Sequence, residues 1–266
     1  MEYTTSRDGT RIAYERAGAG PPAIIIGGAL SDHTGGQGLA AELVGDLTTI
    51  VYDRRSRGHS GDESPGIGGA VEREVEDLAA LVEVAGGRAI LVGGSSGGVL
   101  ALGATLHGLP VERLVLFEPP FAAEQFPPVA PPDMPEQLTA LLAEGRSGDV
   151  VELFLRRAVG LPDATVTAMK ESPAWPAMQE LAPSTVYDAV LTRTYPYPDA
   201  FASVAVPTLV LTGESTFPLL TASARELARV LPDAEHRTVT GSDHVLDPPA
   251  AAEAIRGFLR RPVRRT

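Results

Sequence analysis

The sequence contains no cysteine and only one lysine among its 266 residues. The absence of cysteine excludes disulfide bonds, thiolate metal ligands and a cysteine nucleophile. The only lysine, Lys170, leaves little room for Schiff-base chemistry. Any catalysis must therefore use oxygen and nitrogen side chains.

Positive charge and long apolar runs are also scarce. Lysine and arginine number 22 against 34 acidic residues, and the resulting net charge of −12 argues against nucleic acid as a partner. No apolar run approaches the roughly 20 residues needed to cross a bilayer, so we expect no membrane contact. The polar residues 1–8 lack the apolar centre of a signal peptide, and a cytoplasmic protein is expected.

Short Val/Ile-rich runs alternate with helical patterns along the chain. This order predicts an α/β fold, with a mostly parallel twisted sheet and helices on both faces. Residues 2–6 and 11–17, around the turn pair Asp8-Gly9, predict an antiparallel hairpin at the edge of that sheet. The later strands are expected at residues 23–26, 49–52, 89–92, 114–117, 206–213 and 235–240.

A long segment after the sixth predicted strand has a different character. It contains no convincing strand and shows helical patterns at residues 135–144, 148–159, 162–172 and 175–194. We interpret residues 119–202 as a helical lid inserted into a core formed by residues 1–118 and 203–266. Phe121 and Trp175 are candidates for lining a substrate pocket, and packing within the lid is the alternative for each.

The most informative stretch is residues 90–100. An apolar strand pattern stops at a glycine pair, two serines follow, and a second glycine pair opens an apolar helix. This order fits a G-x-S-x-G nucleophile elbow, in either of two registers. We favour Ser95 over Ser96 as the nucleophile, because the strand then ends at Val92 and the elbow begins directly after it. An anion-binding turn at a helix N-terminus is the alternative.

A second glycine-rich turn, residues 27–30, follows the buried strand 23–26. Glycine at the carboxyl end of a central strand lets the backbone approach a ligand. We expect the amides of Ala29 and Ser96 to form an oxyanion hole, with Gly28 and Leu30 in contact with substrate. A simple turn into a helix would use the same residues.

Two further residues complete a possible catalytic set. Glu118 directly follows the strand 114–117, and His244 lies in the Gly-Ser-Asp-His loop 241–244. With Ser95 they give the chain order serine, acid, histidine.

These motifs together resemble the α/β-hydrolase superfamily with a helical cap, over almost the whole chain. Residues 52–60 resemble its D-x-R-G-x-G-x-S loop, and residues 207–213 resemble its late strand. Most relatives carry the acid three residues after the glycine of that strand, where this chain has Thr216. Some relatives place it after the preceding core strand, the place of Glu118, and Glu214 is the runner-up.

The three arginines beside Asp53 predict a structural ion-pair cluster.

The resemblance implies that Ser95 attacks, His244 accepts its proton and Glu118 holds the imidazole. We expect a serine hydrolase, carboxylic ester hydrolase-like, that cleaves an ester, thioester or lactone of a small to medium apolar substrate through an acyl-enzyme. No metal and no organic cofactor is expected, the partner is a small-molecule substrate, and a homodimer is left open. The alternatives are a cofactor-free lyase or cyclase on the same fold and a ligand-binding pseudo-hydrolase.

Overall fold

The computed structural model describes residues 1–128 and 130–261, so the last five residues of the predicted core segment 203–266 lie outside the described part. Within it, nine strands form one sheet in the order β1-β2-β4-β3-β5-β6-β7-β8-β9. Strands β3 to β8 pair in parallel, while β1, β2 and β9 pair antiparallel. The strands are β1 Glu2–Thr5, β2 Arg11–Ala17, β3 Pro22–Ile26, β4 Thr48–Tyr52, β5 Ala89–Gly94, β6 Val111–Phe117, β7 Thr208–Ser215, β8 Ala234–Ser242 and β9 Val245–Leu246.

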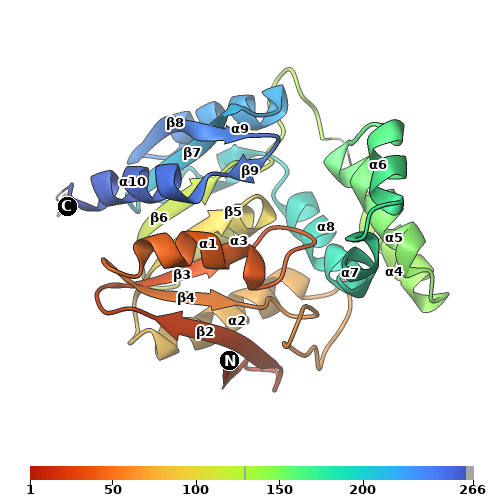
Figure 1. Cartoon of the computed structure of the whole chain (residues 1–266), viewed down its shortest axis with the longest axis horizontal. Coiled ribbons are helices and arrows are strands. Elements are labelled where there is room, and N and C mark those ends of the chain that lie inside the picture. The colour runs from red at the N-terminus through yellow and green to blue at the C-terminus, as the bar shows by residue number, and fades with distance from the viewer. Residues whose placement is uncertain (129, 262–266) are drawn as a thin grey trace.

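Helices cover both faces of this sheet (Figure 1). Side chains alternate between the faces, so Ile24 and Ile26 join one buried cluster while Ile25 joins the other. The first cluster includes residues of α2, α3 and α9, and the second includes residues of α1 and α10. The predicted fold class is therefore confirmed. These helices are α1 Thr34–Leu43, α2 Ala70–Val84, α3 Ser96–Leu106, α9 Pro218–Val230 and α10 Pro248–Leu259.

The helical insertion predicted after the sixth strand is present between β6 and β7, and in Figure 1 its green and teal helices stand to one side of the sheet. The pattern at 175–194 is not one helix, because a 3₁₀ turn containing Pro183 separates α7 from α8. The insertion contains α4 Met134–Ala143, α5 Ser147–Phe154, η1 Leu155–Val159, α6 Asp163–Lys170, α7 Trp175–Glu180, η2 Ala182–Ser184, α8 Thr185–Thr194 and η3 Pro198–Phe201.

None of the helices in the described ranges combines the length and the hydropathy that a membrane span requires. The parallel strands β3 to β8 all point the same way, so their carboxyl ends meet at one edge. Loops at that edge carry most of the polar residues singled out from the sequence.

Candidate active site

Ser95 lies at the tip of the tight turn between β5 and α3, with φ 53° and ψ −126°. The flanking glycines have no room for a side chain: a Cβ on Gly93 would lie 2.4 Å from the Gly97 carbonyl oxygen. A Cβ on Gly97 would lie 2.4 Å from the carbonyl oxygen of Ile26, whereas one on Gly94 would meet nothing within 4 Å. The turn therefore requires glycine two positions before and two after Ser95.

The neighbouring serine has a different environment. Ser96 is the first residue of α3 and is 3% exposed. Its hydroxyl donates to Asp188 Oδ1 at 2.7 Å and accepts from Arg54 Nη1 at 3.3 Å. The Ser96 side chain is thus held in a buried polar network, away from the tip of the turn.

Glu118 follows β6 and is fully buried. Its Oε2 lies 2.5 Å from Nδ1 of His244, and its Oε1 accepts the amide of Gly213 at 2.8 Å. Because both oxygens have partners, the carboxylate is fixed in orientation and in turn fixes the imidazole. With Nδ1 facing Glu118, Nε2 is the ring nitrogen left to face another group.

The His244 ring is also held by packing. It stacks on the ring of Phe117, with centroids 6.0 Å apart and an interplanar angle of 16°. The carbonyl of Phe117 accepts the amide of Ser95 at 2.8 Å, so this residue contacts both the serine loop and the histidine. Thr216, at the position where most relatives have the acid, has a buried hydroxyl without a partner among the described residues.

Backbone strain is concentrated at this edge of the sheet. In the described residues, six non-glycine residues have a positive φ: Leu30, Ser56, Ser95, Glu118, Asp243 and His244. Each such conformation costs about 1–3 kcal/mol and persists only where the surrounding structure enforces it. All six lie in loops that follow β3, β4, β5, β6 or β8, so the strain marks this edge as a candidate functional site.

The glycine turn after β3 presses against the serine. A Cβ on Gly28 would lie 2.9 Å from Ser95 Cβ, so only glycine fits there. The amides of Ala29 and Ser96 donate to no acceptor within the part of the chain that the structure describes. Leu30, which follows Ala29 directly, has φ 53°.

The predicted arginine cluster is confirmed in the loop after β4. Arg54 binds Glu74 through two hydrogen bonds of 2.7 and 2.8 Å, and Arg55 binds Asp77 at 2.6 and 2.7 Å. Arg57 is likewise buried. Paired buried charges of this kind hold a loop rigidly, because separating them would leave one charge uncompensated.

Sequence reasoning missed the acidic centre of this cluster, Asp188 on α8. Its carboxylate accepts Arg54 at 2.9 Å and Arg57 at 2.8 Å, in addition to the hydroxyl of Ser96. Burial opposes ionisation, but the two guanidiniums lower the pKa of Asp188 below its usual value. The only signal in the sequence is an aspartate within the apolar segment 186–191.

The two aromatic candidates for pocket lining lie in packed interiors. Phe121 is fully buried against the ring of Phe201, with centroids 5.5 Å apart. Trp175 is 8% exposed, and its indole nitrogen would be 3.8 Å from a Cβ placed on Gly148 of α5. This burial fits the alternative in which both belong to the core of the insertion.

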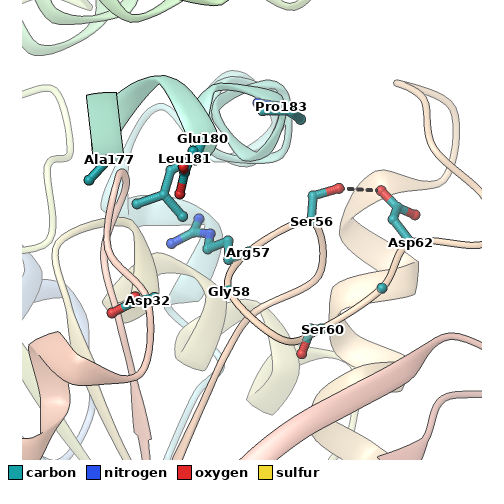
Figure 2. Close-up of a pocket in the computed structure, with 11 residues that line it drawn as sticks. Asp32, Ser56, Arg57, Gly58, Ser60, Asp62, Ala177, Glu180, Leu181 and Pro183 are labelled. Atoms are coloured by element: carbon teal, nitrogen blue, oxygen red, sulfur yellow. Dashed lines mark hydrogen bonds between the residues drawn. The ribbon is translucent and has the colours of Figure 1, made fainter. Parts of the chain in front are cut away.

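A cavity of about 350 Å³ lies between the insertion and the loops after β3 and β4 (Figure 2). Its lining mixes polar and apolar residues, and it includes neither aromatic candidate and neither Ser95 nor His244. The lining residues are Asp32, Ser56, Arg57, Gly58, Ser60, Gly61, Asp62, Ala177, Glu180, Leu181 and Pro183.

One group of side chains in residues 1–128 and 130–261 has the spacing of a metal site. His33, Asp53 and His59 each offer an atom within 4.8 Å of the others. The Asp53 carboxylate already accepts the amides of both histidines, at 2.7 and 2.8 Å, and the Nδ1 of His33 at 2.8 Å. These hydrogen bonds tie the loop after β3 to the loop after β4 without an ion.

The sequence of the chain matches the model of the Alpha/beta hydrolase family over residues 26–256. The chain belongs to this family, which confirms the resemblance found in its motifs.

Similar proteins include an alpha/beta hydrolase from Sphaerobacter thermophilus, whose structure matches with a TM-score of 0.89 at 44% identity, covering 97% of this chain and 100% of that one. The sequence is also 27% identical to a 2-(acetamidomethylene)succinate hydrolase of Mesorhizobium japonicum, over 91% of this chain and 89% of that protein. An enol-lactonase from Burkholderia xenovorans shares the fold alone, with a TM-score of 0.75 at 18% identity and coverage of 98% and 100%.

Proposed function

We propose that the protein is a serine hydrolase in which Ser95, His244 and Glu118 form the catalytic triad. The observation that carries the proposal is the 2.5 Å hydrogen bond between His244 Nδ1 and Glu118 Oε2. It supplies the histidine with an acid although Thr216 stands where most relatives have one. The Glu118 carboxylate is fully buried, and its partners in the described residues are the imidazole of His244 and the amide of Gly213.

In this mechanism Ser95 attacks the carbonyl carbon of the substrate while Nε2 of His244 takes the hydroxyl proton. Glu118 keeps Nδ1 protonated, so that Nε2 is the basic nitrogen, and stabilises the imidazolium that forms. His244 then gives the proton to the leaving group, and an acyl-enzyme remains on Ser95. A water molecule activated by the same imidazole releases the acid product.

The negative oxygen of the tetrahedral intermediate is met by the amides of Ala29 and Ser96. The support is that neither amide has another acceptor in the described residues and that Gly28 packs directly on the serine. The amide of Ser96 also opens α3, where the helix dipole favours a negative charge. Loss of one such donor typically costs about 3–4 kcal/mol of transition-state stabilisation.

For the substrate we propose an ester, thioester or lactone of small to medium size. Acyl transfer to a serine suits these bonds, because an alkoxide or a thiolate is a better leaving group than an amide anion, and His244 can supply the proton that the leaving atom takes up. The enol-lactonase with the similar fold is named for a bond of this class, and its structure resembles this chain over nearly the whole length.

A fluorophosphonate probe and a series of short p-nitrophenyl esters test this proposal. We expect the probe to label Ser95, and Ser95→Ala to lose both labelling and at least about 10⁴-fold in kcat. Ser203→Ala, at an exposed serine outside the site, is the matched control and should keep wild-type rates.

The two other possible results would favour the two alternative functions. An unlabelled wild-type protein that leaves all the esters intact would contradict the hydrolase and favour a ligand-binding role. Labelling of Ser95 without hydrolysis of any ester, thioester or lactone would instead favour a lyase or cyclase.

A further inference from the structure

Arg57 connects the arginine cluster to the loop that carries one of the proposed oxyanion donors. Its Nη1 donates to the carbonyl oxygen of Gly28 and, at 3.1 Å, to that of Ser31. Its Nη2 donates to Asp188 Oδ2 at 2.8 Å. Figure 2 shows this side chain between the loop after β4 and the segment of the insertion that contains Leu181. The guanidinium therefore ties the turn after β3 to Asp188 of the insertion.

The Gly28 carbonyl and the Ala29 N–H belong to the same peptide group. No cis peptide bond occurs in the described residues, and in a trans peptide the C=O and N–H bonds point in opposite directions. A guanidinium bound to the carbonyl of Gly28 therefore turns the Ala29 N–H away from itself. The peptide group that Gly28 shares with Ala29 lies beside Ser95, since a Cβ on Gly28 would lie only 2.9 Å from Ser95 Cβ.

The charge on Arg57 also acts on the strength of this donor. A cation that binds the oxygen of a peptide group polarises it and makes its N–H a better hydrogen-bond donor. The carboxylate of Asp188 is shared among Arg57, Arg54 and the hydroxyl of Ser96, so it compensates Arg57 only in part. The remaining positive field falls on the carbonyl groups of Gly28 and Ser31.

We propose that Arg57 is a positioning residue of the oxyanion hole, which aims and polarises the Ala29 amide through the Gly28 carbonyl. This inference rests on the proposed function. The same network fixes the second donor, since Asp188 binds both Arg57 and the hydroxyl of Ser96. Helix α8 of the insertion thereby anchors both oxyanion donors. Arg57 occupies a variable position of the D-x-R-G-x-G-x-S pattern, whereas Arg55 is the arginine that the pattern specifies.

Arg55 provides a matched control two residues away. It is also fully buried and paired, with Asp77 at 2.6 and 2.7 Å and with Asp8 at 2.9 Å. None of its hydrogen bonds in the described residues reaches the turn 27–31. Arg55→Lys and Arg57→Lys therefore disturb comparable buried ion pairs, but only the second touches the oxyanion loop.

The experiment compares these two variants in three measurements: kcat and KM on a p-nitrophenyl ester, the rate of Ser95 labelling by a fluorophosphonate, and the affinity for a boronic acid that mimics the tetrahedral intermediate. For Arg57→Lys we expect kcat to fall about 10- to 100-fold, less than the full loss of one donor, with KM within twofold. Labelling and boronate affinity should fall by a similar factor. Arg55→Lys should keep kcat within twofold even where its melting temperature drops.

Wild-type labelling and boronate affinity in Arg57→Lys would overturn the inference while leaving the proposed function intact. A raised KM with unchanged kcat would also overturn it, and would make Arg57 a substrate contact in the cavity that it lines. If Arg57→Lys does not fold, Arg57→Gln keeps a donor for Gly28 without the charge and must show the same loss. A wild-type protein that takes no probe at Ser95 contradicts the proposed function itself.

Discussion

The carboxyl edge of the sheet carries two groups of polar residues that are built in opposite ways. Ser95, Glu118 and His244 come from three separate loops, all have positive φ, and the only side-chain pair joined is Glu118 with His244. The arginine loop after β4 contains three buried guanidiniums, and each pairs with at least one carboxylate from another element. Backbone strain is present at all three residues of the first group, whereas the second group is defined by buried charge and has one strained residue, Ser56.

This difference predicts whether a substitution should lower activity or stability. In the first group an isosteric change removes one hydrogen bond and leaves packing untouched, so activity should fall and stability should stay. In the second group the loss of one partner leaves a buried charge uncompensated, so stability should fall. The exceptions are Arg57, which donates to the carbonyl of Gly28, and Arg54, which donates to the carbonyl of Gly27 and to the hydroxyl of Ser96, so both arginines couple the two groups.

The largest expected effect is on activity, from Glu118→Gln. The amide can donate to Nδ1 of His244 and so stabilise the wrong tautomer, and we expect kcat to fall about 10³- to 10⁴-fold. The free energy of unfolding, measured in urea, should change by less than about 1 kcal/mol, because the shape is conserved. Glu214→Gln changes the exposed runner-up carboxylate and should leave kcat unaltered. A loss of activity in that control, with Glu118→Gln active, would reverse the assignment.

The next effect is on stability, from Arg54→Met. This change leaves Glu74 without its bidentate partner and removes one of two guanidiniums from Asp188. We expect the free energy of unfolding in urea to fall by about 3–5 kcal/mol. Arg229→Met, which breaks only an exposed pair with Glu226, should cost far less. Equal losses in the two variants would show that burial of the cluster contributes nothing.

The two groups also differ in how far the sequence predicts them. The sequence predicts the elbow because its strand, its glycines and its serine are contiguous in the chain. Glu118 beside His244 follows from chain order together with the rule that parallel strands end at one edge. The three arginines predict an ion-pair cluster. Asp188, the partner that Arg54 and Arg57 share, lies more than 130 residues further along the chain. The packing of α8 on the core brings Asp188 to the arginines, and the periodicity of the sequence does not predict how α8 packs.

The same limit explains the aromatic side chains. An aromatic residue in an insertion has the same sequence pattern whether it faces a ligand or a neighbouring helix. Phe121 meets Phe201, 80 residues away, so its burial depends on how η3 packs against the start of the insertion. The cavity between the insertion and the loops after β3 and β4 likewise depends on the placement of α7, which no local motif specifies.

A smaller effect separates two glycines of the elbow, Gly97 and Gly94. Gly97→Ala would place a Cβ 2.4 Å from the backbone oxygen of Ile26, which cannot move without shifting β3. We expect a loss of about 1–3 kcal/mol in the free energy of unfolding, together with a lower kcat. Gly94→Ala meets open space and should change stability by less than about 0.5 kcal/mol. Comparable losses at both positions would contradict the register that presents Ser95.

The smallest effect concerns the pH dependence that the arginine loop adds to stability. Burial raises the pKa of Asp8, but hydrogen bonds from Arg55 and Thr10 outweigh it and lower the pKa to about 2. A depressed pKa of this kind contributes stability above the unfolded-state value near 3.8, and this contribution disappears as the pH falls from about 4 to 2. Because solvent screens this carboxylate, we expect its contribution to stability to be about 1 kcal/mol.

In urea unfolding at pH 5 and pH 2, Asp8→Asn should lose that much less stability than the wild type. Asp233→Asn, whose carboxylate has no side-chain hydrogen bond within the described ranges, should follow the wild-type curve. Parallel curves for all three proteins would remove Asp8 from the charged cluster and restrict the cluster to its buried members.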